Sequence, residues 1–209
     1  MRYELKSNGL FIVFEGIDGS GKNAHIRLLT KRLTDKGYDV LVTAEPWISE
    51  EGKILREIAK SGDLEIPPEE EANLYLADRI KHVRKEILPA LEAGKIVLCS
   101  RYYYSTMAYQ GALGADPERI REENEAAVPT PDVVIMLKID IDESQRRINK
   151  RKKELELRYE NDIYLQKVSR ILYSIEGDKI HYVSTDGTKE EVSKKIFKII
   201  LPYLPDFKA

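Results

Sequence analysis

The amino-acid sequence predicts an α/β fold, in which a five-stranded parallel sheet is covered by helices on both faces. Two observations lead to this prediction. Short apolar runs alternate with stretches of helical periodicity along the chain, as in proteins whose strands are joined by crossover helices. Several of the runs, including 10–14 and 133–137, are apolar at successive positions, which is typical of strands buried on both faces of a sheet.

The expected elements follow from local sequence signals. Strands are expected where short apolar runs are bounded by turn residues, at 10–15, 39–43, 96–100, 132–138 and 180–184. Helices are expected where apolar residues recur every three or four positions, at 22–36, at 52–60, after Pro67-Pro68 to Glu92 with a bend at Pro89, at 105–110, at 117–127, between the last two strands and after Thr188. Thr188 and Glu191 have the spacing of a capping box at the start of the last helix.

The composition limits the class of protein. The chain has 209 residues, of which 42% are hydrophobic, and no repeat or flexible linker divides it, so we expect one domain over residues 1–209. The formal net charge of −2 does not favour a nucleic-acid partner, and the apolar runs are far shorter than the ~18 residues of a membrane span. The single cysteine, Cys99, excludes an intrachain disulfide. We therefore expect a cytoplasmic protein with no membrane partner.

A glycine-rich loop carries the clearest chemical signal. Residues 16–22 fit the P-loop pattern G-x-x-x-x-G-K and lie between an expected strand and an expected helix, which is the context that this motif requires. Glycines let successive backbone N–H groups point at phosphate oxygens, while the helix N-terminus and Lys22 add positive charge. The predicted ATP-binding residues are Gly16, Ile17, Asp18, Gly19, Ser20, Gly21, Lys22 and Asn23. Asn23 is a departure, because the motif has Ser or Thr there to contact Mg²⁺.

Further motifs, in order along the chain, make the sequence resemble the thymidylate kinase family. The matching segments are the phosphate-binding loop at 14–22, the acidic-proline loop at Glu45-Pro46 with Gly52 and Arg56 after it, the thymine-reading motif at 77–79, the D-R-Y…S…A-Y-Q-G block at 101–111 and the end of the lid at 158–160. The resemblance implies a P-loop NTPase fold and transfer of the ATP γ-phosphate to dTMP, giving dTDP. It also implies Mg²⁺ on the ATP phosphates and a homodimer.

The resemblance assigns a set of acceptor-binding residues. Arg101 would hold the dTMP phosphate, with Arg56 as a second phosphate-binding arginine. Arg79 would donate to thymine O4 while Tyr75, one helical turn earlier, stacks on the base, and Tyr109 would crowd the 2′ position and favour deoxyribose. The remaining implied contacts are Asp18, Glu45, Ser105, Thr106, Gln110 and Tyr159.

A basic segment at about 143–160 resembles the lid that closes over ATP. On spacing alone, a solvated basic helix face is the ordinary interpretation of such a segment. In one subclass of the family the transition-state arginine comes from the lid, and in the other from the phosphate loop. Because Gly19 stands where the second subclass has arginine, the lid is expected to supply it, from Arg151 or Arg158. With Lys22 and Arg101, these are the predicted catalytic residues.

Two residues near the expected metal depart from the family pattern. Position 23 is Asn, and the third strand ends in Ser100-Arg101 where the family has Asp-Arg. We expect ATP phosphates to hold Mg²⁺, with Asn23, Asp18 and Glu45 as candidate contacts. Two alternatives to a thymidylate kinase stay open: a kinase for another nucleotide or small acceptor, and a nucleotide-binding protein with weakened catalysis.

Overall fold

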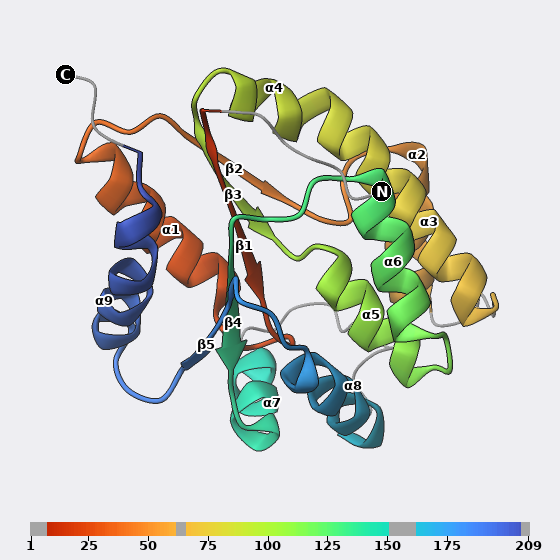
Figure 1. The fold of residues 1–209 in the computed structure, drawn as a ribbon. Coiled ribbons are helices and arrows are strands. Elements are labelled where there is room, and N and C mark those ends of the chain that lie inside the picture. The colour runs from red at the N-terminus through yellow and green to blue at the C-terminus, as the bar shows by residue number, and fades with distance from the viewer. Residues whose placement is uncertain (1–7, 62–65, 151–161, 206–209) are drawn as a thin grey trace.

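A computed structural model of the chain describes residues 8–61, 66–150 and 162–205. Five strands form one parallel sheet in the order β2-β3-β1-β4-β5, with helices on both faces (Figure 1). The strands are β1 (Leu10–Glu15), β2 (Val40–Ala44), β3 (Ile96–Ser100), β4 (Val133–Lys138) and β5 (Ile180–Ser184). The predicted fold class is therefore confirmed.

Alternating side chains of the central strand β1 build two hydrophobic layers. Ile12 and Phe14 pack with α1 (Lys22–Thr34) and α9 (Lys189–Ile200) on one face of the sheet. Phe11 and Val13 belong to the larger core on the other face, and full burial of each such side chain contributes roughly 1.5–3 kcal/mol. The remaining helices are α2 (Glu50–Ser61), α3 (Pro68–His82), α4 (Leu88–Glu92), α5 (Tyr103–Ala112), α6 (Pro117–Ala127), α7 (Ile141–Asn149) and α8 (Asp162–Ser174).

The long helix that was expected to run to Glu92 is interrupted before Pro89. Five residues, Val83–Ile87, form a π-helical turn between α3 and α4, in which the backbone N–H of Leu88 donates to the carbonyl of Val83. Proline has no N–H to donate, and its ring crowds the carbonyl four residues earlier, so a wider turn relieves both problems. At the last helix the predicted capping box is confirmed, since Thr188 and Glu191 exchange both hydrogen bonds.

The strand register brings three functional segments to one edge of the sheet. Phe14 and Ala44 both lie opposite Ser100, on either side of β3. Because parallel strands end at the same edge, the glycine-rich loop after β1, Glu45 after β2 and Arg101 after β3 emerge side by side. Ligands of open α/β sheets bind at this edge.

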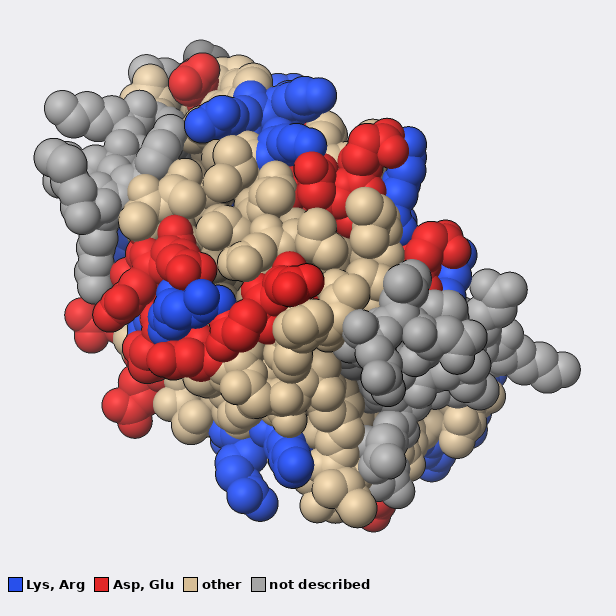
Figure 2. All heavy atoms as spheres, turned by 90° about the vertical axis from the view of Figure 1, so that its right-hand side faces the viewer, with Lys and Arg blue, Asp and Glu red and all other residues tan. Residues whose placement is uncertain are grey.

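The surface around the helices of the larger core carries charges of both signs. Figure 2 shows acidic and basic side chains interleaved over this face. Surface ion pairs account for part of the pattern, including Glu51 with Lys81 and Glu69 with Arg119. Among the described helices, none is long and apolar enough to cross a membrane.

Candidate active site

A cavity of about 210 Å³ lies at the carboxyl edge of the sheet. The structure brings ten of the predicted acceptor residues together around it: Asp18, Glu45, Arg56, Tyr75, Arg79, Arg101, Ser105, Thr106, Tyr109 and Gln110. These residues come from segments as far apart in sequence as the phosphate loop and α5, so only the fold could unite them.

The phosphate loop has the backbone geometry that its glycines predict. Gly16, Gly19 and Gly21 have φ values of 144°, 79° and 96°, in a region that other residues rarely adopt. The Lys22 ammonium is buried and donates to the carbonyls of Gly16 and Ile17, at 2.7 and 3.1 Å. The ammonium group of Lys22 therefore lies against the backbone of the phosphate loop.

Position 19 has no room for a side chain. A Cβ atom there would lie 2.5 Å from the carbonyl oxygen of Ser144, the residue of α7 whose hydroxyl also donates to the carbonyl of Asp18. Because the obstacle is backbone, it cannot swing aside as a flexible side chain could. An arginine is therefore excluded from this point of the loop.

Arg101 is held at the mouth of the loop in a strained conformation. Its φ is 69°, uncommon for a residue with a Cβ and typical of functional sites. The guanidinium donates to Asp18 at 2.7 Å, to Ser105 at 3.0 Å and to Tyr109 at 3.2 Å. Burial alone would lower the pKa of Arg101, but Asp18 and Tyr109 outweigh burial and hold the pKa above its ordinary value. Arg101 is thus a fixed positive charge.

Glu15, for which the sequence predicted no role, holds the segment that follows Arg101 in place. Its buried carboxylate accepts from the backbone N–H groups of Tyr102 and Ser105, at 2.7 and 3.2 Å, and from the Ser105 hydroxyl at 2.5 Å. Burial raises the pKa of Glu15, while the Ser105 hydrogen bond and the Arg101 charge oppose the rise. The carboxylate thereby ties the end of β1 to the start of α5.

Arg79 is a fully buried cation in the wall of the cavity. Its Nε donates to Glu45 at 2.7 Å, its Nη1 to Asn124 at 2.6 Å and its Nη2 to Thr106 at 3.1 Å. Within the described part of the chain, three of the five N–H groups of the guanidinium are engaged in this way, which leaves one on each terminal nitrogen. Asn124, another residue without a predicted role, lies on α6 and does not line the cavity.

The segment after β2 is anchored by buried polar contacts. Glu45 accepts from Arg79 through Oε2, and its Oε1 lies 3.2 Å from Nδ1 of His82. The peptide bond before Pro46 is cis. Trp47 donates from its backbone to Asp78, and its ring stacks on His82 at 5.4 Å between centroids. Trp47 therefore anchors the loop.

One amide in the cavity wall has no hydrogen-bond partner among the residues that the structure describes. Gln110 is fully buried, and neither its Oε1 nor its Nε2 forms a hydrogen bond within the described part of the chain. Buried polar groups are nearly always paired, so an amide left unpaired in a cavity wall indicates a ligand with donor and acceptor groups. Tyr75, one turn before Arg79, lines the same cavity.

The two residues that depart from the P-loop and family patterns contact each other. The Ser100 hydroxyl donates to the Asn23 amide oxygen at 3.2 Å. Both side chains carry oxygen atoms of the kind that Mg²⁺ accepts as ligands. Asp18, a third oxygen donor, lies in the phosphate loop that precedes Asn23. Among the described residues, no three His, Cys, Asp or Glu side chains gather in a way that could hold a metal ion.

Comparisons with known proteins agree with this geometry. The family model described as thymidylate kinase matches residues 14–196. The chain belongs to the thymidylate kinase family. It is 41% identical to the thymidylate kinase of Desulfotalea psychrophila over 90% of this chain and 92% of that one. It is 39% identical to the thymidylate kinase of Akkermansia muciniphila over 99% and 98%, and 49% identical to a probable thymidylate kinase of Pyrococcus horikoshii over 68% and 71%.

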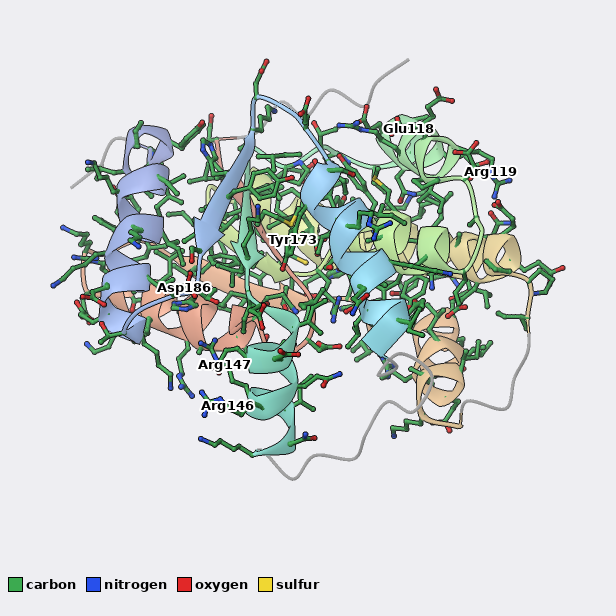
Figure 3. The ribbon with its side chains drawn as sticks, turned by 90° about the horizontal axis from the view of Figure 1, so that it is seen from below. Glu118, Arg119, Arg146, Arg147, Tyr173 and Asp186 are labelled. Carbon is green, nitrogen blue, oxygen red and sulfur yellow. The ribbon has the colours of Figure 1, made fainter. Side chains whose placement is uncertain are left out.

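Of the segment predicted to be the lid, about 143–160, the structure describes the part up to Lys150, most of it in α7. Figure 3 shows Arg146 and Arg147 projecting from α7 on the side of Asp186. Both arginines bond to Glu143, at distances of 2.6 to 2.7 Å, and these hydrogen bonds lower the pKa of Glu143 to about 2. The candidates Arg151, Arg158 and Tyr159 lie outside the described residues.

Proposed function

We propose that this chain transfers the γ-phosphate of ATP to dTMP, giving dTDP. One observation carries the proposal beyond family membership: a single cavity has a fixed cation, Arg101, beside the phosphate loop, and two fully buried polar side chains, Arg79 and Gln110, in its wall. This spacing of functions suits a nucleoside monophosphate, whose phosphate must face ATP while its base is recognised elsewhere.

The chain's own groups would act mainly by positioning and charge. Phosphoryl transfer needs little covalent help from the protein, because the barrier falls chiefly through alignment and electrostatic stabilisation. Lys22 and the N–H groups of the loop would hold the β- and γ-phosphates of ATP. Arg101 would grip the acceptor phosphate with its planar fork of donors.

The acceptor base would be recognised by groups that are already in place. The two remaining N–H groups of Arg79 suit a carbonyl oxygen such as thymine O4. Gln110, Ser105 and Thr106 would complete the base edge, and Tyr75 would stack on the ring. Tyr109, packed edge-on against Tyr164 at 6.3 Å between centroids, would crowd a 2′-hydroxyl.

Bound Mg²⁺ would neutralise charge on the ATP phosphates. The oxygen donors fit a metal held chiefly by those phosphates and water, with Asn23, Ser100 and Asp18 as the nearby protein groups. Glu45 was also a candidate contact, but its two oxygens already face Arg79 and His82. We therefore assign Glu45 to the support of Arg79.

The transition-state arginine would come from the lid, with Arg151 and Arg158 as candidates. The crowding at Gly19 supports this choice, because it removes the loop as a source. Tyr159 would stand near the acceptor sugar. We further propose that the enzyme is cytoplasmic and works as a homodimer. Analytical ultracentrifugation of the purified chain tests the dimer.

An acceptor panel tests the proposed function. The purified chain would be incubated with radiolabelled ATP, Mg²⁺ and one of dTMP, dUMP, dCMP, thymidine or ribothymidine monophosphate. We expect dTDP to form fastest. Equal or faster transfer to another acceptor would contradict the assignment of dTMP as the preferred substrate. ATP binding without transfer to any acceptor would favour the nucleotide-binding alternative.

A further inference from the structure

We propose that Asn124 is a positioning residue that fixes the Arg79 guanidinium and thereby sets the preference for a base with a carbonyl oxygen over a base with an amino group. The inference rests on the proposed function, in which Arg79 reads the acceptor base. Asn124 lies on α6 and Arg79 on α3, 45 residues apart in sequence, yet their side chains bond at 2.6 Å.

The Asn124 amide has one orientation that satisfies both of its ends. Its Nδ2 donates to the carbonyl of Ile120, one turn earlier on α6, at 2.7 Å. This bond leaves Oδ1 as the atom that faces Arg79. In the opposite orientation, the amide N–H groups would face the N–H groups of the guanidinium, and the amide oxygen would face the carbonyl oxygen of Ile120. The hydrogen bond within the helix therefore presents the oxygen to Arg79.

The sequence of α6 argues against a purely space-filling role for this asparagine. The buried residues of the helix are Ile120 and Asn124, four positions apart and therefore on one face, while its other residues are mostly charged. A space-filling residue at position 124 would be apolar, because burying an amide costs free energy unless it is paired. The pairing that Asn124 has beyond its own helix is with Arg79.

Asn124 completes a three-sided hold on the guanidinium. Glu45 fixes Nε, Asn124 fixes Nη1 and Thr106 fixes Nη2. Glu45 and Thr106 also line the cavity, whereas Asn124 does not. Without its oxygen, a buried N–H would lose its acceptor and the guanidinium could turn about the Glu45 contact, which would move the two remaining donors away from the base. Asn124 therefore reaches the acceptor indirectly, through its hydrogen bond to Arg79.

Two substitutions and a matched control separate positioning from packing. Asn124→Leu keeps the number and branching of the side-chain atoms but removes the oxygen, whereas Asn124→Asp keeps an oxygen acceptor for Arg79 and gives up the N–H donor to Ile120. Ile120→Val perturbs the same buried face of α6 without touching the polar contacts. For each protein we would measure kcat/KM with dTMP and with dCMP, whose base carries an amino group in place of O4, together with the KM for ATP and the melting temperature.

We expect Asn124→Leu to lower kcat/KM for dTMP roughly 10- to 100-fold, the usual consequence of unpairing a buried charged donor. The ratio of dTMP to dCMP should fall by about tenfold or more, while the KM for ATP stays within about twofold. Asn124→Asp and Ile120→Val should keep the wild-type ratio. In an Arg79→Ala background, Asn124→Leu should change the ratio no further.

An unchanged ratio in Asn124→Leu would overturn the inference, as would a further loss in the double variant. If Asn124→Leu does not fold, Asn124→Ser takes its place, because the shorter side chain withdraws the oxygen from Arg79. Failure of the proposed function is distinct, since the wild-type chain would then show no preference for dTMP, and that result would overturn both.

Discussion

Replacing Arg101 by alanine should impair use of the acceptor far more than use of ATP. The guanidinium is held by Asp18, Ser105 and Tyr109, at 2.7, 3.0 and 3.2 Å, and is therefore poised before any phosphate arrives. A bound phosphate would add two charge-assisted hydrogen bonds, and such bonds are each worth about 1.5–3 kcal/mol. The substitution removes the contacts with Asp18, Ser105 and Tyr109 from both the free enzyme and the dTMP complex. These contacts therefore cancel in the change of binding free energy.

The lower end of that range for two bonds gives about 3 kcal/mol, or roughly 100-fold in kcat/KM for dTMP. Initial rates would be measured with dTMP varied at saturating ATP and with ATP varied at saturating dTMP. Arg101→Lys is the matched variant, because it keeps the charge but not the planar fork, and we expect an intermediate loss. Both variants keep a Cβ, so neither relieves the left-handed backbone at φ 69°. An equal rise in the KM for ATP, or a KM for dTMP within about threefold of wild type, would refute the assignment.

Four further outcomes are expected. Lys22→Ala should lower kcat roughly 100-fold or more at saturating nucleotides, because phosphate charge is left unneutralised in the transition state; a change in KM alone would contradict this. Tyr109→Ala should narrow the kcat/KM gap between dTMP and its ribose counterpart about tenfold, as one ring-to-hydroxyl clash is removed; an unchanged gap would place the sugar elsewhere. Asn23→Thr combined with Ser100→Asp should lower the Mg²⁺ concentration that half-saturates dTDP formation at fixed ATP, and an unchanged or higher value would remove these residues from the metal's surroundings. Glu143 should titrate near pH 2 by NMR, so its stabilising contribution is complete above pH 4.5 and is lost as the pH falls toward 2; a midpoint near 4.5 would mean that its contacts with the arginines do not persist.

The parts of the fold that could be predicted are those that local patterns determine. The strand at 10–15 and the helix at 117–127 have the same bounds in the structure, because a bulky apolar run and a proline-started amphipathic stretch each have one good solution. The π-helical turn at Val83–Ile87 could not be foreseen in detail. Proline indicates an interruption, but packing decides whether the helix bends, ends or widens.

The site shows the same division. The phosphate loop is visible in sequence because its chemistry is local, whereas the support of Arg79 depends on Asn124, which is distant in the chain. An asparagine among the charged residues of α6 resembles any solvated residue until the tertiary structure buries it. Glu15 was missed for a related reason. When a glutamate ends an apolar strand, the sequence does not show whether its carboxylate is buried and hydrogen-bonded or exposed to solvent.

The position of dTMP in the cavity is the central claim, and a crystal structure of the chain with dTMP bound tests it most directly. The phosphate oxygens should lie within hydrogen-bond distance of Arg101, thymine O4 should accept from Arg79, and the Gln110 amide should bond to the nucleotide. A nucleotide seated outside this cavity, or one bound in reverse with its base toward Arg101, would contradict the account.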